Sequence, residues 1–222
     1  MKQATKAKKK AVHVSTQEKI LLAATKVFAE RGFRDATTRM ICAEADVNVA
    51  LVNYYFRSKA ELYKAVIAAL FENTGKPLMA LPDTVTDAAS WQRAMRAWVT
   101  RSLAICAACE PPDMWVARLI GLEECVPSDV TQGIEEKFRK PMHQCFERLL
   151  RMAMKTDDPL EASVWASTVS AQYMVYAFTK QGWAFRFCPP GVSREAWLER
   201  VADQICTGVF SRLSFQGAGH PA

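Results

Sequence analysis

Apolar residues recur at the three- and four-residue spacing of helices along most of this chain, and alternating strand patterns are hard to find. This periodicity predicts an all-α protein. The expected helices run from Ser15 to about Gly32, near residues 38–45, from about Asn48, from Ser58 to about Gly75, and near residues 91–110, 114–122, 127–150, 160–181 and 193–213. Residues 76–88 carry two prolines and several turn formers, which predicts a loop.

Capping residues mark the expected starts of two helices. Ser15 with Glu18 and Ser58 with Glu61 have the spacing of a capping box, in which each side chain accepts the other residue's backbone N–H. Gly32 is expected to end the first helix as a left-handed C-cap. These signals fix where the chain starts and stops its first long helix.

Residues 37–62, TTRMICAEADVNVALVNYYFRSKAEL, hold two short helical patterns joined by a tight turn. Asp46 and Asn48 suit that turn because Asp and Asn tolerate left-handed backbone and can cap a following helix. In the second helix we expect Val47, Tyr55 and either Leu51 or Val52 to face inward. This arrangement is the helix-turn-helix plan.

The charge of the chain is unevenly distributed. Its net charge is +6, and the first 60 residues carry 12 Lys and Arg against 5 Asp and Glu, whereas the remainder carries 17 against 18. A basic N-terminal part favours a polyanionic partner, either nucleic acid or an anionic membrane surface. Residues 1–14 lack an apolar stripe, so we expect a disordered basic tail that acts as a solubilising segment or as an arm on DNA.

The helix-turn-helix segment resembles the DNA-binding signature of the TetR family of bacterial transcription regulators. The matching residues are Thr37, Thr38, Ile41, Ala45, Val47, Tyr55, Phe56, Ser58, Lys59 and Leu62. The chain departs from the family at Asp46, Asn48 and Asn53. The resemblance implies a three-helix DNA-binding domain at residues 15–62, a connecting helix into an effector-binding and dimerisation domain at residues 63–214, and a frayed tail at residues 215–222.

For DNA contacts we expect the exposed face of the second short helix in the major groove, where Asn53 can bond an adenine edge. Residues at the start of the first short helix are expected on the DNA backbone, and Tyr54 and Lys59 on phosphates. Tyr55 and Phe56 are expected to form a hydrophobic hinge. The predicted DNA-binding residues are Thr37, Thr38, Arg39, Asn48, Val49, Ala50, Leu51, Asn53, Tyr54 and Lys59.

For the C-terminal part the family resemblance implies an apolar effector cavity and a homodimer formed by the last two long helices. The candidate effector residues are Trp98, Trp115, Arg118, Glu123, His143, Phe146, Gln172 and Tyr176. The candidate dimer residues are Trp165, Tyr173, Trp183, Trp197, Ile205 and Val209. Each aromatic side chain in these sets could equally belong to an ordinary core. Glu123 with Pro127 also resembles a short feature of the CecR-like branch of the family.

Catalytic and metal-binding chemistry has little support in the sequence. Cys106 and Cys109 have the CxxC spacing, but that is also the spacing of one helical face, and no second such pair follows. No Gly-rich phosphate loop, HExxH motif or nucleophile elbow is present. We therefore expect no enzyme activity, no metal and no cofactor.

These observations predict a ligand-responsive transcription regulator that binds a palindromic operator as a dimer. A repressor released by a small-molecule effector is the first interpretation, and an activator of the same fold is the alternative. A helical ligand carrier or membrane-surface protein with a lipid-binding tail is a second class. Seven cysteines and no apolar segment of a signal peptide lead us to expect a cytoplasmic protein without membrane insertion.

Overall fold

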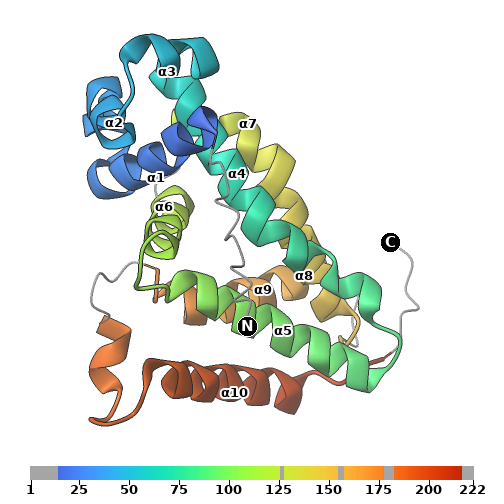
Figure 1. Ribbon diagram of the computed structural model, residues 1–222. Helices are drawn as coiled ribbons and strands as arrows, with labels where there is room; N and C mark the ends of the chain where they lie inside the picture. The colour runs from blue at the N-terminus through green and yellow to red at the C-terminus, as the bar shows by residue number, and fades with distance from the viewer. Residues whose placement is uncertain (1–14, 126–127, 155–157, 178–182, 217–222) are drawn as a thin grey trace, which may run out of the picture.

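The computed structural model describes residues 15–125, 128–154, 158–177 and 183–216. All regular elements in these residues are helical, which confirms the all-α prediction. Figure 1 shows α1, α2 and α3 together at one end of the molecule and α5 and α10 side by side at the other, with α4 running between the two ends.

The helices follow in an order close to the expected one. They are α1 (Thr16–Asp35), α2 (Thr38–Ala45), α3 (Val49–Phe56), α4 (Lys59–Met79), η1 (Leu81–Thr84), α5 (Ala88–Cys106), α6 (Asp113–Cys125), η2 (Asp129–Thr131), α7 (Gln132–Ile134), the π-helical turn η3 (Glu135–Arg139), α8 (Lys140–Arg151), α9 (Pro159–Met174), η4 (Trp183–Phe187) and α10 (Arg194–Arg212).

The start of α1 follows the sequence signal. Ser15 and Glu18 form the expected capping box, with Ser15 N donating to Glu18 Oε2 at 2.7 Å and Glu18 N donating to Ser15 Oγ at 3.2 Å. Gly32 has φ 75° and ψ 168°, a conformation that is essentially restricted to glycine, so the chain turns there before one last helical turn. Gly32 therefore breaks the helix near the predicted end, but it is not the predicted left-handed C-cap, because α1 continues to Asp35 and is capped at Ala36.

The connecting helix α4 is longer than predicted. We expected it to end near Gly75 and a loop to follow, but it continues through Pro77 to Met79. Arg101 supports this last turn, because its Nη1 donates to Pro77 O at 3.0 Å. At its start Ser58 Oγ accepts from Glu61 N at 3.1 Å, but Ser58 N donates to Phe56 O at 2.6 Å and the Glu61 carboxylate pairs with Lys64 at 2.9 Å. Only half of the predicted capping box therefore forms.

Two hydrophobic cores divide the molecule differently from the predicted domains. One joins the three N-terminal helices to α4, to Leu119 of α6 and to Phe138 of η3, and the other is built from α5, α8, α9 and α10. α6 therefore shares a core with the helix-turn-helix, although it is remote from it in sequence. α4 contributes to both cores, with Leu62 in the first and Leu78 in the second.

Several expected boundaries in the body need correction. The segment predicted as one helix from Pro127 consists of η2, α7, η3 and α8, and α9 ends at Met174 instead of near residue 181. Phe215 packs on the core and Gln216 N donates to Met152 O at 2.9 Å, so the expected frayed tail does not begin at residue 215. The basic tail at residues 1–14 lies outside the described residues.

Candidate DNA-binding surface and ligand cavity

The turn between α2 and α3 has the geometry expected from its sequence. Asp46 adopts the left-handed conformation, with φ 53° and ψ 52°, and ends α2. Asn48 caps α3, since its Oδ1 accepts from Leu51 N at 2.9 Å, and Thr37 caps α2 by accepting from Met40 N at 3.2 Å. The side-chain oxygens of Thr37 and Asn48 therefore cap the first turns of α2 and α3.

The two faces of α3 separate buried from exposed side chains. Val52 and Phe56 are buried in the core of the N-terminal helices, and Leu51 is half-buried against it. Tyr55 was expected to face inward, but 39% of it is exposed, because the buried stripe runs through positions 52 and 56 instead. Of the two residues expected to form a hydrophobic hinge, only Phe56 is buried.

The exposed face of α3 carries most of the predicted base-contacting residues. Val49, Ala50 and Asn53 are exposed, and Tyr54 is 78% exposed, with its ring against that of Tyr55 at 5.1 Å. On α2, Arg39 is exposed and Thr38 is half-buried. An exposed helix that is anchored by its opposite face is the arrangement with which a helix-turn-helix reaches the major groove.

Lys59 occupies a different place from the one predicted. Its Nζ donates to Phe33 O at 2.8 Å, to Arg34 O at 3.2 Å and to Ala36 O at 2.8 Å, and it lies 4.6 Å from the Phe33 ring centroid. An ammonium group has three N–H donors, and these carbonyls take all three. The side chain is therefore engaged in closing the C-terminal end of α1, which argues against the expected phosphate contact.

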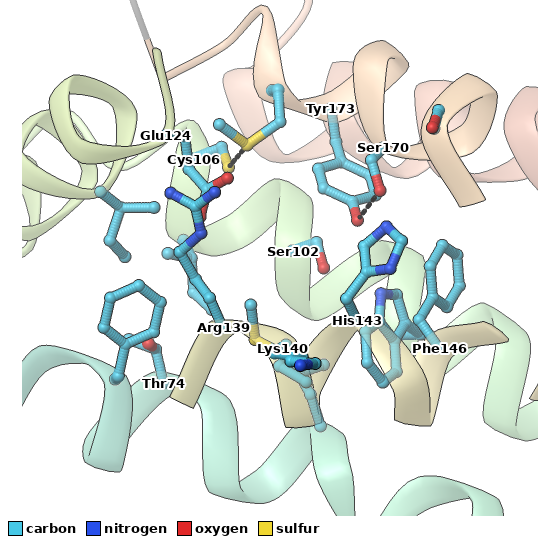
Figure 2. A pocket seen from close by; sticks show the side chains of 18 of the residues that line it. Thr74, Ser102, Cys106, Glu124, Arg139, Lys140, His143, Phe146, Ser170 and Tyr173 are labelled. Carbon is cyan, nitrogen blue, oxygen red and sulfur yellow. Dashed lines mark hydrogen bonds and ion pairs between the residues drawn. The ribbon is translucent and has the colours of Figure 1, made fainter. Parts of the chain in front are cut away.

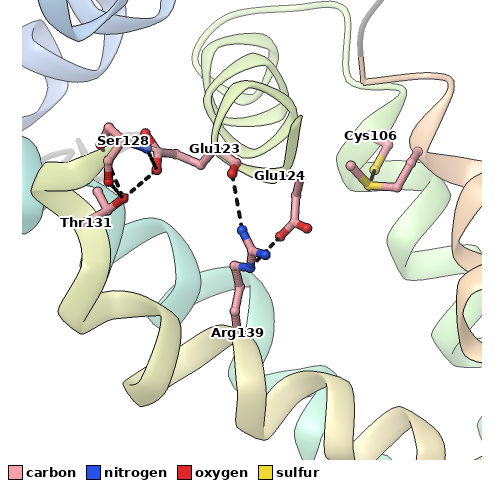
Figure 3. A network of polar contacts seen from close by, with 7 residues as sticks. Cys106, Glu123, Glu124, Ser128, Thr131 and Arg139 are labelled. Carbon is pink, nitrogen blue, oxygen red and sulfur yellow. Dashed lines mark hydrogen bonds and ion pairs between the residues drawn. The ribbon is translucent and has the colours of Figure 1, made fainter. Parts of the chain in front are cut away.

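A buried polar contact connects α4 with α6. Tyr63 is 2% exposed and its hydroxyl donates to the carboxylate of Glu123, which is 5% exposed. Glu123 also accepts from Thr131 Oγ1 at 2.6 Å (Figure 3). Burial and this hydrogen bond raise the pKa of Tyr63 well above its ordinary value, so the phenol stays protonated as the donor.

The same tyrosine contacts the first helix. Its ring lies at 4.8 Å from that of Phe28 in an edge-to-face arrangement and at 4.9 Å from that of Phe33. Tyr63 is thus the place where α1, α4 and α6 meet.

A cavity of about 660 Å³ lies between α4, α5, α6, α8 and α9. Its apolar lining includes Phe71, Trp98, Phe146, Met142 and Met174. This size is within the range of pockets that bind small organic molecules. The remaining lining residues are Thr74, Leu78, Ser102, Ile105, Cys106, Ile120, Glu124, Arg139, Lys140, His143, Gln144, Glu147, Ser167, Ser170 and Tyr173.

The polar groups of the cavity gather on opposite sides. Figure 2 shows Arg139 and Glu124 on one side and Ser170, Tyr173 and His143 on the other. Arg139 Nε lies 3.6 Å from Glu124 Oε1, and the hydroxyls of Ser170 and Tyr173 are 2.8 Å apart. Burial raises the pKa of Tyr173, and hydrogen bonding by Ser170 opposes that rise.

Three of the eight predicted effector residues line this cavity: Trp98, His143 and Phe146. The other five are not part of its lining, because their side chains serve other contacts or the outer surface. Trp115 packs in the N-terminal core, Glu123 bonds Tyr63, Tyr176 packs on Phe185, Gln172 is exposed and bonds Thr168 O, and Arg118 is half-buried elsewhere on α6.

Arg139 is among the cavity residues that the sequence did not indicate. It precedes Met142 and Phe146 by three and seven residues, so it falls on the apolar stripe that leads into α8. A charged residue within an apolar stripe is the sequence signal that could have indicated Arg139 as a cavity residue.

The predicted dimer residues lie mostly inside one chain. Tyr173, Ile205 and Val209 are buried in the core of the body, and Trp165 is half-buried against it. Ile205 and Val209 lie on α10, which packs against α5, and Tyr173 lies on α9, which packs against α8 and α5. These three side chains are therefore part of the core of one chain. Trp197 is half-buried, and the side chain of Trp183 lies outside the described residues.

The cysteine pair does not form a ligand set in the described part of the chain. Cys106 is buried and its Sγ contacts Met174 Sδ at 3.9 Å, whereas Cys109 is exposed beyond the end of α5. No group of three or more His, Cys, Asp or Glu side chains gathers within the described residues. None of the described helices is long and apolar enough to cross a membrane.

The anchored α3 and the cavity beside α4 define a helix-turn-helix protein with a helical body. Residues 20–66 match the model of the bacterial regulatory proteins of the tetR family. A probable HTH-type transcriptional regulator of Bacillus subtilis (strain 168), YttP, is 38% identical over 65 residues, which are 29% of this chain and 31% of that relative's length.

Solved structures match almost the whole chain. The ketosteroid transcriptional regulator KstR2 of Mycobacterium tuberculosis has a TM-score of 0.63 and 16% identity, covering 91% of this chain and 96% of its own. AibR in complex with isovaleryl coenzyme A and operator DNA has a TM-score of 0.66 and 14% identity, covering 88% and 98%. At these identities the likeness establishes the fold.

Residues 20–66, which include α2 and α3, therefore match the TetR family that the helix-turn-helix residues resemble, and this confirms the predicted resemblance over that part of the chain. The chain spans about a third of the length of the curated relative, whose name is that of a transcriptional regulator. The likeness of Glu123 to the CecR-like branch stays a prediction, since Pro127 lies outside the described residues.

Proposed function

We propose that this protein is a ligand-responsive transcriptional repressor, which binds a palindromic operator as a homodimer and leaves it when a small molecule occupies the cavity. The observation that carries the proposal is the exposed face of α3 on its buried anchor. A protein that binds operator DNA in this way acts in the cytoplasm.

For DNA recognition we propose that Val49, Ala50, Asn53 and Tyr54 enter the major groove. Asn53 can give two hydrogen bonds to an adenine edge, and the small apolar side chains can contact thymine methyl groups. Arg39 at the start of α2 is the proposed phosphate contact. Thr37 and Asn48 act through their helix caps, and Leu51 supports the helix from its inner side.

For the effector we propose the cavity lined by Trp98, His143 and Phe146. Its size and apolar lining support a small organic ligand. The neighbour AibR, whose structure contains isovaleryl coenzyme A and operator DNA, is an example of this fold with both partners. The ligand releases DNA only if it binds more tightly to a conformation whose α3 helices are wrongly spaced.

For the dimer we propose the outer face of α9, in place of the buried residues that the sequence suggested. Leu160 and Val164 are 69% and 55% exposed, one turn apart on this helix. Two copies related by a two-fold axis would present their α3 helices to successive major grooves, about 34–36 Å apart.

The test is the affinity for the DNA upstream of the protein's own gene. Asn53→Ala should weaken specific binding roughly 5- to 150-fold, the equivalent of about 1–3 kcal/mol for a bidentate base contact. Asn73→Ala, at an exposed position of α4 outside the surface, is the matched control and should bind as the unchanged protein does. Equal binding by both variants would refute the recognition surface.

A further inference from the structure

We propose that the cavity takes an apolar ligand with an anionic group, which the guanidinium of Arg139 receives, and that Arg139 passes this event to the DNA-binding domain through the Glu123–Tyr63 hydrogen bond. The proposal rests on the proposed function, because it names the class of the effector and the contacts through which it acts.

Arg139 joins the cavity to the C-terminal end of α6. It lines the cavity, its Nη1 donates to Glu123 O at 3.2 Å and its Nε lies 3.6 Å from the Glu124 carboxylate (Figure 3). One side chain thus holds two consecutive residues of α6 from the side of η3. A ligand that draws this guanidinium toward itself changes how α6 is held.

The charges of the lining favour an anionic ligand over a cationic one. The basic side chains Arg139, Lys140 and His143 lie within five consecutive residues. Lys140 also pairs with Glu136 at 3.2 Å, and the carboxylates of the lining are Glu124 and Glu147. Glu147, the carboxylate on the same helix, already accepts from Ser163 Oγ at 2.7 Å and lies 3.2 Å from His143 Nδ1. A cation would have to break the contacts of Glu147, whereas an anion would be attracted by the basic side chains.

The contact of Arg139 with the Glu124 carboxylate is of a kind that an anion can replace. The 3.6 Å separation from Glu124 is longer than a direct charge-assisted hydrogen bond, and 28% of the Glu124 side chain is exposed. A ligand sulfonate or carboxylate can approach the planar guanidinium with two short hydrogen bonds. Glu124 can then turn toward solvent, so no unpaired charge is left buried.

Glu123, the residue next to Glu124, connects α6 to the DNA-binding domain. Glu123 is buried and its carboxylate accepts from Tyr63, which also packs on Phe28 and Phe33 of the DNA-binding domain. Tyr63 and Glu123 touch neither the cavity nor the proposed DNA surface, so they act as positioning residues. A shift at the end of α6 moves the acceptor of Tyr63, and with it the contact surface of α1.

The ligand class is tested with two probes that differ by one sulfonate group. 1-Anilinonaphthalene-8-sulfonate carries a sulfonate, and N-phenyl-1-naphthylamine is the same skeleton without it. Arg139→Gln should weaken binding of the sulfonate about 10- to 100-fold, the usual effect of a charge-assisted bond, and leave the neutral probe unchanged. Arg148→Gln, an exposed arginine outside the cavity lining, is the control and should change neither.

Equal loss of both probes in Arg139→Gln, or no loss of either, would overturn the ligand class. Tighter binding of a cationic dye of similar size, rhodamine 6G, to the unchanged protein would overturn it as well.

The relay is tested with a DNA duplex that the protein selects from a random pool. Saturating duplex should weaken sulfonate binding at least about fivefold in the unchanged protein, since coupling between two sites is reciprocal. In Tyr63→Phe the sulfonate should bind the free protein as before, but the effect of DNA should fall below about twofold. An undiminished effect of DNA in Tyr63→Phe would overturn the relay.

If no duplex is selected, the proposed function fails and the relay fails with it. The comparison of the two probes still decides the ligand class in that case, because it uses the free protein.

Discussion

Lys59 gives the sharpest prediction, because the sequence predicts a phosphate contact for it and the structure shows it bound to carbonyl groups at the end of α1. As a phosphate contact, Lys59→Ala would weaken binding to all DNA sequences and lower the dependence of log K on log salt by about one. As the group that closes α1, it should instead stabilise the folded DNA-binding domain. We expect the second result.

The size of the effect follows from the three carbonyls around its Nζ, at 2.8, 3.2 and 2.8 Å. A hydrogen bond to a charged group contributes roughly 1.5–3 kcal/mol to stability. Because Lys59 is only half-buried and water can replace part of the lost bonds, we expect Lys59→Ala to lower the free energy of unfolding by about 2–4 kcal/mol in total. In a chain of this size that corresponds to a Tm lower by about 5–15 °C.

The assay is thermal unfolding together with DNA binding at several salt concentrations, at a temperature where both variants are folded. Lys64→Ala is the matched control, since Lys64 lies on the same helix in an exposed pair with Glu61. It should change stability by less than about 0.5 kcal/mol. The reasoning is refuted if Lys59→Ala keeps its Tm while the salt slope falls by about one.

Three further predictions concern backbone conformation, titration and thiol chemistry. Gly32→Ala should lower the free energy of unfolding by about 1–3 kcal/mol in urea, because φ 75° and ψ 168° suit only glycine, whereas Gly133→Ala, with free space around its Cβ, should not. The unfolded chain releases the Tyr63 proton near pH 10.0, but the folded protein retains it because its pKa is raised, so stability should fall as pH rises above that value, and less steeply in Tyr63→Phe. Burial and a nearby carboxylate raise the pKa of the Cys106 thiol to about 12, so a disulfide reagent at pH 8 should modify exposed Cys109 first, and Cys109→Ser should remove more of the fast phase than Cys106→Ser does.

Local signals made the N-terminal domain predictable. The capping box at Ser15, the left-handed Asp46 and the cap at Asn48 each depend on residues no more than four positions apart, and the structure contains all three. Short-range backbone hydrogen bonds leave little choice of conformation at such positions. The exposed face of α3 followed from the same periodicity, except that Tyr55 was expected to face inward and is exposed.

The cavity and the dimer residues were much less predictable. Aromatic residues are frequent in the body, and periodicity cannot tell a core position from a cavity wall or a dimer surface. Ile205 and Val209 illustrate this, since their helix packs on α5, which is about a hundred residues earlier in the chain. Arg139 was missed because its partners, the end of α6 and the cavity, come together only in the folded chain.

By itself the sequence determined the all-α class, the helix-turn-helix and the family resemblance of that segment, because these follow from local hydrogen bonding, periodicity and a contiguous motif. Only the tertiary structure decided that Lys59 closes α1, that α6 shares a core with the DNA-binding helices, and that Tyr63 meets Glu123 there. The hydrogen bonds of Lys59 and Tyr63 join residues 23 to 60 positions apart. Their partners are chosen by the packing of apolar faces, which the order of residues along the chain does not specify.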